Sequence, residues 1–203
     1  NDDGMPPQFV VEKLYEITGG QAIITTEVGQ NQMWAAHYYK TDQPRQFLSS
    51  GGLGTMGYGF PAAIGAQFAN PERIVVDIAG DGSLQMNIQE MATAMDHKIP
   101  VKICLLNNGY LGMVRQWQDL FFQKRYSGVT LSERPDWVKL AEAYGAVGFS
   151  TDNPDEVPGL IEQALAINDR PVIMDFRVSR EENVFPMIPA GQAVENMLLE
   201  RPK

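Results

Sequence analysis

The sequence predicts an α/β fold, a doubly wound and mostly parallel sheet with helices on both faces. Short apolar runs rich in β-branched residues alternate with segments of helical periodicity, and loops containing glycine, asparagine or aspartate separate them. Strands joined through helices pair in parallel, and such a sheet is covered on both faces. Because ligands bind outside the carboxyl ends of these strands, we expect the functional residues in the loops that follow them.

Five short apolar segments bounded by turn residues are expected to be strands. They are residues 22–26, 47–48, 73–79, 101–106 and 171–178. The segment 47–48 is the weakest of these predictions because it offers only two apolar residues.

Segments with apolar residues at helical spacing are expected to be helices. They are residues 9–17, 31–39, 61–69, 84–95, 111–120, 136–144 and 155–167. Thr18-Gly19-Gly20 ends the first helix, Asn31 is expected to cap the second, and Pro61 stands near the first turn of the third. The apolar face predicted for the helix over 84–95 consists of Leu84, Ile88, Met91, Ala92 and Met95.

Composition and charge exclude several classes of protein. The chain has 203 residues, 44% of them hydrophobic and 20% charged, which suits one globular domain and two at most. A net charge of -9 without a basic run argues against a nucleic-acid partner. Cys104 is the single cysteine, so an internal disulfide is excluded, and its apolar surroundings predict a buried structural thiol.

We expect one cofactor-binding domain over residues 8–185, preceded by a linker or cut edge at 1–7 and followed by a C-terminal tail at 186–203. Residues 46–71 lack charge but contain six glycines and two prolines, which does not suit a membrane helix. The acidic, polar amino end is unlike a signal peptide. His37 and His97 have no partner pattern and are assigned no chemistry.

A first glycine motif, Gly52-Leu53-Gly54-Thr55-Met56-Gly57, matches the dinucleotide pattern G-x-G-x-x-G, with Asp77 near the place of a ribose-binding acid. Its context is poor, because the preceding strand is short and Pro61 places the helix start after the motif. Asp77 also falls inside an expected strand, where a neighbouring side chain would satisfy it. Dinucleotide binding is therefore an alternative, and it predicts NADH affinity that survives removal of Asp81.

A second motif joins Gly80-Asp81-Gly82-Ser83 to Asn107-Asn108, each directly after an expected buried strand. Carboxylate and amide oxygens at adjacent strand ends are the ligands that Mg²⁺ prefers. Gly80 and Gly82 let the backbone approach a phosphate, and the following helix directs N–H groups toward it. The two halves together predict a site for a cation and a diphosphate. The alternative is a turn in which Asp81 caps a helix, with an unrelated turn at Asn107-Asn108.

The second motif resembles the fingerprint for thiamine diphosphate and magnesium, and longer words extend the resemblance. These words are Glu27-Val28-Gly29-Gln30, Gln32-Met33-Trp34-Ala35-Ala36, Ser50-Gly51-Gly52-Leu53-Gly54-Thr55-Met56-Gly57, Met86-Asn87-Ile88-Gln89-Glu90 and Leu111-Gly112-Met113-Val114-Arg115-Gln116-Trp117. They resemble the catalytic (large) subunits of acetohydroxyacid synthases, also called acetolactate synthases. The resemblance runs from about residue 8 to residue 187 and covers only the carboxyl-terminal, diphosphate-binding third of such a subunit.

The resemblance implies roles for individual residues. It implies that Asp81, the side-chain oxygen of Asn108 and the backbone carbonyl of Tyr110 bind Mg²⁺. It implies further cofactor contacts at Val28, Gly29, Gln30, Asn31, Gly54, Met56, Gly80, Gly82, Ser83, Met86, Leu111, Gly112, Met113 and Val114. Met56 would hold the two cofactor rings in a bent shape, as a bulky thioether can. Trp117 would face the substrate and favour 2-ketobutyrate over pyruvate, although packing on a helix face is the plainer interpretation.

The implied reaction joins two 2-ketoacids after loss of carbon dioxide from pyruvate. The products, 2-acetolactate or 2-aceto-2-hydroxybutyrate, are precursors of branched-chain amino acids. In this family the activating glutamate lies in an amino-terminal domain and a non-redox FAD lies in a middle domain. We therefore expect this chain to be inactive alone, and the whole subunit to form a homodimer or tetramer, in some cases with a regulatory small subunit, in the cytoplasm or an organelle.

One position departs from the family pattern, because Asn31 stands where histidine is common. Asn31 can donate to a phosphate but cannot transfer a proton. Two related alternatives are another thiamine diphosphate decarboxylase or carboligase, and a stand-alone cofactor-binding subunit of a split enzyme. In the family the tail over 186–203 can close over the site; without periodicity it can equally be disordered.

Overall fold

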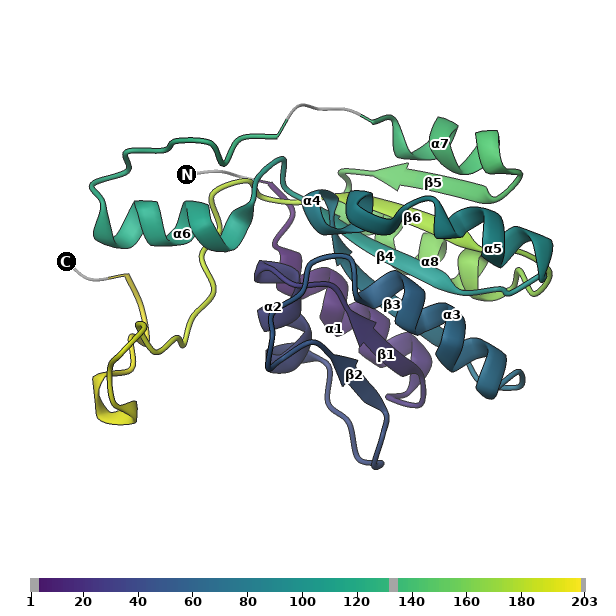
Figure 1. Ribbon diagram of the computed structural model, residues 1–203, viewed down its shortest axis with the longest axis horizontal. Coiled ribbons are helices and arrows are strands. Elements are labelled where there is room, and N and C mark those ends of the chain that lie inside the picture. The colour runs from purple at the N-terminus through teal and green to yellow at the C-terminus, as the bar shows by residue number, and fades with distance from the viewer. Residues whose placement is uncertain (1–3, 132–134, 202–203) are drawn as a thin grey trace.

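In the computed structural model, which describes residues 4–131 and 135–201, six strands form one sheet (Figure 1). The strand order is β2-β1-β3-β4-β6-β5, and each neighbouring pair is parallel. The strands are β1 (Ile23–Thr26), β2 (Phe47–Ser49), β3 (Val75–Gly80), β4 (Lys102–Asn107), β5 (Val147–Thr151) and β6 (Val172–Arg177). The predicted fold class is confirmed.

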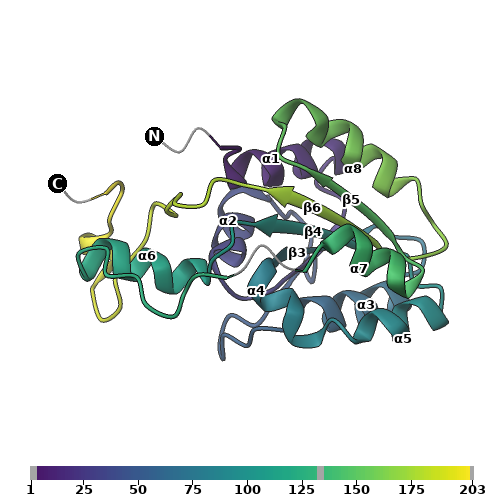
Figure 2. The same cartoon turned by 90° about the horizontal axis from the view of Figure 1, so that it is seen from above.

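Helices cover both faces of the sheet (Figure 2). One layer contains α1 (Pro7–Thr18), α2 (Gln30–Tyr38) and α8 (Val157–Leu165), and the other contains α3 (Gly59–Ala69), α5 (Glu90–Asp96) and α7 (Trp137–Tyr144). The helix α6 (Gly112–Phe121) instead projects beside the sheet, next to the C-terminal tail.

Alternate residues of the central strands point into the two helix layers. On β3, Val76 and Ile78 belong to the core beneath α1, whereas Val75 and Ala79 belong to the core beneath α3. This period of two is what a strand buried on both faces requires. Cys104 on β4 is fully buried, and burial raises the pKa of its thiol, so it is structural as predicted.

The sheet reverses its strand order between β1 and β3. From β1 the chain passes through α2 to β2 on one side, and β3 then pairs with the other side of β1. Such a reversal opens a crevice outside the carboxyl ends of the strands, where ligands bind in doubly wound folds. Glu27, Asp81 and Asn108 directly follow β1, β3 and β4 at this crevice.

The helix predicted over 84–95 is divided into three shorter elements. These are α4 (Asp81–Leu84), the 3-10 helix η1 (Gln85–Asn87) and α5. The amide of Asn87 donates to the carbonyl of Gly57 at 2.6 Å and ties the middle turn to the glycine-rich loop. The interruption changes the phase of the buried face, so Ala94 is buried and the predicted Ala92 is exposed.

Two other details differ from the sequence predictions. Strand β5 was not predicted, and it forms the edge of the sheet beside β6. The cap predicted at Asn31 is wrong, because α2 begins at Gln30 with Gly29 as its N-cap. Asn31 lies inside the first turn, and its amide donates to the carbonyl of Ile78 in β3 at 3.0 Å.

The amino-terminal end of the described chain packs on the sheet, and the carboxyl-terminal end contacts α6. Met5, within the segment expected to be an edge, is buried and forms a parallel bridge with Val178. The tail contains the 3-10 helix η3 (Val194–Asn196) and an antiparallel bridge between Met187 and Leu198. Residues 1–3 of the predicted edge and 202–203 of the predicted tail lie outside the described residues. Over the described ranges, no helix is long and apolar enough to cross a membrane.

Candidate functional site

A cavity of about 180 Å³ opens at the carboxyl ends of the central strands, between the first turns of α2 and α6. It is lined by Val28, Gly29, Gln30, Asn31, Trp34, Gly54, Met56, Gly80, Asp81, Gly82, Ser83, Leu106, Asn108, Tyr110, Leu111, Gly112, Met113 and Val114. The structure thus brings both glycine-rich segments and the residues after β4 to one place. Of the residues that the resemblance implied, Met86 and Trp117 do not line the cavity; their exposed fractions are 54% and 41%.

Asp81 places a buried carboxylate at the end of β3. Its Oδ2 accepts the backbone N–H of Gly109 at 3.1 Å, across from β4. Burial raises the pKa of Asp81 to about 7, against the lowering effect of backbone hydrogen bonds from Gly109 and Gly82. A cation beside this carboxylate would offset the desolvation that burial imposes.

Asn108 supplies the second half of the site, at the end of β4. Its Oδ1 accepts the N–H of Tyr110 at 3.0 Å, and its Nδ2 donates to Oε1 of Gln30 at 3.1 Å. The next residue, Gly109, has a φ of +69°, a left-handed conformation that favours glycine and turns its N–H to Asp81. The two halves of the second motif are therefore in contact.

The donor set decides which cation would fit. Among the described residues, no group of three His, Cys, Asp or Glu side chains could hold a metal ion. The site instead offers the Asp81 carboxylate, the Asn108 amide oxygen and nearby backbone carbonyls, all of them hard oxygen ligands. Such a set suits Mg²⁺, which commonly keeps its other positions for phosphate oxygens and water.

Small residues and a helix end form the part of the cavity that could hold phosphate. A Cβ on Gly82 would lie 2.7 Å from Leu111 Cδ2, and a Cβ on Gly80 would lie 3.1 Å from Asn31 Oδ1. In the described structure no side chain caps the start of α2, so the first-turn N–H groups of this nine-residue helix have no capping acceptor. Glycines that admit close approach beside a helix N-terminus form a typical anion site.

Glu27 is a site residue to which sequence reasoning gave no role. It is fully buried after β1, and its carboxylate accepts the N–H groups of Gly57 at 2.6 Å and Phe60 at 3.1 Å. These bonds fix the end of the loop that carries Gly54 and Met56 into the cavity. The sequence does contain a signal for Glu27, because an acidic residue directly after an apolar strand lies at the edge of the sheet where ligands bind.

Asp77 is held inside the sheet and does not line the cavity. Thr25 donates its hydroxyl to Asp77 Oδ1 at 2.9 Å. Burial, and secondarily the charge of Glu27, raise the pKa of Asp77 well above its ordinary value. A fully buried carboxyl that accepts a hydrogen bond from a neighbouring strand matches the plainer interpretation of Asp77 and gives the dinucleotide alternative no ribose-binding acid.

Comparison with known proteins places these observations in a family. Residues 27–176 match the family described as "Thiamine pyrophosphate enzyme, C-terminal TPP binding domain". The chain is 49% identical over 197 residues to the acetolactate synthase large subunit of Haemophilus influenzae, covering 97% of this chain and 34% of that protein. It is 46% identical to the acetolactate synthase isozyme 3 large subunit of Escherichia coli, covering 99% of this chain and 35% of that protein. The chain thus spans about a third of the length of these relatives.

Proposed function

The chain belongs to the thiamine pyrophosphate enzymes, whose C-terminal cofactor-binding domain it contains, and we propose that it forms the thiamine diphosphate and Mg²⁺ site of an acetolactate synthase. One observation carries this proposal: the buried carboxylate of Asp81 lies against the Asn108–Gly109 turn without a cationic side chain among its hydrogen-bond partners in the described structure. The similarity to acetolactate synthase large subunits supports the choice within the family.

In this proposal Asp81, the Asn108 side-chain oxygen and the Tyr110 carbonyl hold Mg²⁺. Gly82, Ser83 and the first turn of α2, with Asn31, receive the diphosphate. The bound cofactor supplies a nucleophilic carbon and an electron sink for decarboxylating a 2-ketoacid. The protein contributes position and the exclusion of water.

The apolar wall of the cavity would hold the rings of the cofactor. Met56, Leu111 and Met113 line it, and the Met56 methyl group would lie 3.7 Å from a Cβ on Gly82. Met56 therefore lies beside the proposed diphosphate cradle, where a flexible thioether can support a bent cofactor. Trp117, one turn beyond Met113 on α6, would contact the acceptor substrate once other parts of the protein cover it.

For the whole protein we propose joining of pyruvate to pyruvate or to 2-ketobutyrate. The names of the relatives, acetolactate synthases, support the formation of acetolactate, and this chain covers about a third of their length. The remaining two thirds of such a protein would supply the activating glutamate and the FAD site. On this proposal the isolated chain binds cofactor but produces no acetolactate.

Calorimetric titration of thiamine diphosphate into the chain, with Mg²⁺ or with EDTA, tests the site. We expect heat that depends on Mg²⁺ and affinity that falls by at least about 100-fold in Asp81→Asn, beyond the loss typical for a residue behind the ligands. Asp175→Asn is the matched control, because Asp175 is also a buried carboxyl but does not line the cavity. Equal binding in EDTA, or unchanged binding by folded Asp81→Asn, would refute the magnesium site.

A further inference from the structure

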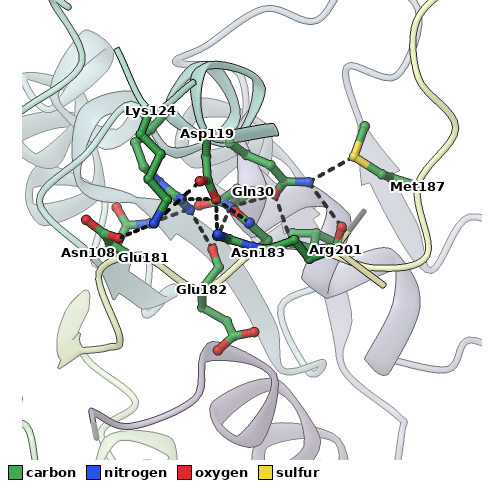
Figure 3. A network of polar contacts seen from close by, with 12 residues as sticks. Gln30, Asn108, Asp119, Lys124, Glu181, Glu182, Asn183, Met187 and Arg201 are labelled. Atoms are coloured by element: carbon green, nitrogen blue, oxygen red, sulfur yellow. Dashed lines mark hydrogen bonds and ion pairs between the residues drawn. The ribbon is translucent and has the colours of Figure 1, made fainter. Parts of the chain in front are cut away.

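Side-chain amides connect α6 to the proposed magnesium ligand Asn108, within the polar network of Figure 3. We infer that Gln116 and Gln30 are positioning residues, which orient the Asn108 amide so that its oxygen remains available to the metal. This inference rests on the proposed function, because it concerns the same site. In this inference the side chains of Gln116 and Gln30 support Asn108 and do not contact the cofactor.

The backbone of Val184, in the segment after β6, fixes the orientation of Gln116. Its Oε1 accepts the N–H of Val184 at 2.8 Å, and its Nε2 donates to the carbonyl of Val184 at 3.1 Å. Nε2 also contacts the sulfur of Met187 at 3.0 Å. Because an N–H and a C=O of one residue are both satisfied, exchanging the two ends of the Gln116 amide would break both bonds.

Gln30 transmits this orientation across the cavity wall. Its Nε2 donates to Oε1 of Gln116 at 2.8 Å and to the carbonyl of Glu182 at 2.9 Å. Both N–H bonds of the amide are therefore used, and its Oε1 accepts from Nδ2 of Asn108 at 3.1 Å. All three amides are buried, where an unmatched donor or acceptor costs about 1–3 kcal/mol.

The consequence for Asn108 is that its nitrogen faces Gln30 and its oxygen faces the turn beside Asp81. The N–H of Tyr110, which donates to this oxygen at 3.0 Å, agrees with the same orientation. An amide oxygen binds Mg²⁺, whereas an amide NH₂ presents only donors and repels the cation. The amide chain thus selects the end of Asn108 that can serve as a ligand.

Gly112 makes room for this arrangement at the start of α6. A Cβ on Gly112 would lie 2.9 Å from Cδ of Gln30 and 3.0 Å from Nδ2 of Asn108. Any larger residue would therefore displace one of these two amides. The glycine of the Leu111-Gly112-Met113 segment is explained by this contact, and its φ does not lie in the left-handed region.

The same hydrogen bonds change the role that we assign to the Gln30 side chain. The resemblance implied a cofactor contact at Gln30, yet both donors of its side chain are already bound to protein acceptors. Its backbone, at the first position of α2, remains suited to the phosphate. The Gln30 side chain therefore belongs to the support behind the metal ligand.

Binding of Mn²⁺ in place of Mg²⁺, followed by electron paramagnetic resonance with thiamine diphosphate present, tests the inference without any turnover. For Gln116→Leu we expect the Mn²⁺ dissociation constant to rise 10–100-fold, the usual loss when support behind a ligand is removed. For Gln116→Glu we expect a change below about threefold, because a carboxylate oxygen still accepts from Gln30 and Val184. Gln118→Leu is the matched control on α6, since the Gln118 side chain bonds only to the backbone of Ser127 among the described residues.

The outcomes separate the inference from the proposed function. Unchanged Mn²⁺ affinity in folded Gln116→Leu would overturn the inference while leaving the Asp81 site intact. Equal weakening in Gln116→Glu and Gln116→Leu would also overturn it, because the loss would then come from the bond to the Val184 carbonyl. Wild-type chain that binds no Mn²⁺, with circular dichroism confirming its fold, would refute both the magnesium site and the inference.

Discussion

Two buried carboxyl groups lie close together at neighbouring strands, because Glu27 directly follows β1 and Asp77 lies on β3. Glu27 accepts backbone N–H groups from Gly57 and Phe60. Asp77 accepts only from Thr25 among the described residues, and its Oδ2 has no partner there. Burial raises the pKa of both carboxyls, and the charge of Glu27 raises that of Asp77 further. The proton is therefore held on Asp77, and Glu27 keeps the charge that anchors the glycine-rich loop.

This pair predicts a stability change that depends on pH. Asp77 has a raised pKa in the folded state, so its favourable contribution is complete below its ordinary pKa and is lost as pH rises through the folded value. Asp77→Asn keeps the Thr25 bond but cannot ionise, so its melting temperature should increasingly exceed that of wild type from pH 5 to pH 8. Thermal melts across this range check the trend, with exposed Asp96→Asn as control. A difference that is constant with pH would contradict the assignment of the proton.

The sequence was sufficient to bring the proposed ligand residues to one edge of the sheet, but not to identify the residues that support them. Asp81 and Asn108 were predictable because each directly follows an apolar strand, and parallel strands end at one edge. Gln30 and Gln116 belong to α2 and α6, and no local spacing indicates that their amides meet. Their contact depends on the path of the segment after β6, where the backbone of Glu182 and Val184 fixes both amides.

At the scale of elements, α3 contains two glycines with opposite surroundings. A Cβ on Gly59 would lie 2.6 Å from the backbone nitrogen of Glu27, whereas a Cβ on Gly65 would meet nothing within 4 Å. Gly59→Ala should therefore destabilise the chain by about 3 kcal/mol through overpacking against β1. Gly65→Ala should stabilise it by about 0.5–1 kcal/mol, because alanine loses less entropy in a helix.

Urea denaturation of both variants measures these changes in the free energy of unfolding. The comparison is matched, since both substitutions add one methyl group to the same helix. A stable Gly59→Ala variant would mean that α3 can move away from β1 without cost, contrary to the close packing seen here.

Strand β5, which was not predicted, and the divided helix over 84–95 show where the apolar periodicity of the sequence fails to predict an element. Strand β5 contains Gly148 and Ser150 and is buried mainly at one end, so its apolar pattern is weak. Its glycine is required because a Cβ there would lie 2.6 Å from the backbone of Val138 in α7. The segment over 84–95 kept its helical periodicity, but the bond from Asn87 to Gly57 interrupts it. Tertiary contacts outweigh local propensity in both places.

At the scale of the whole molecule, α6 differs from the other helices because it buries polar side chains and exposes apolar ones. Arg115, Gln116 and Asp119 form its buried face, and Arg115 donates to the carbonyl of Glu182 at 2.7 Å while pairing with Asp119 at 3.6 Å. Asn183, in the segment after β6, and Arg201 of the tail also donate to Asp119 (Figure 3). The tail thus packs on the polar side of α6 and leaves the apolar side outward.

The apolar side of α6 predicts self-association of the isolated chain. Trp117 and Phe121 lie one turn apart, with exposed fractions of 41% and 46%, on a helix that projects beside the sheet (Figure 1). Exposed apolar patches of this kind are typical of protein interfaces. Light scattering should give a mass above that of one chain, rising with concentration, and the double variant Trp117→Gln, Phe121→Gln should restore the mass of one chain. Phe68→Gln is the control, because Phe68 is 73% exposed on α3, away from α6. If the wild-type chain has the mass of one chain at high concentration, the prediction of self-association is wrong. The apolar side of α6 would then be stable in contact with water.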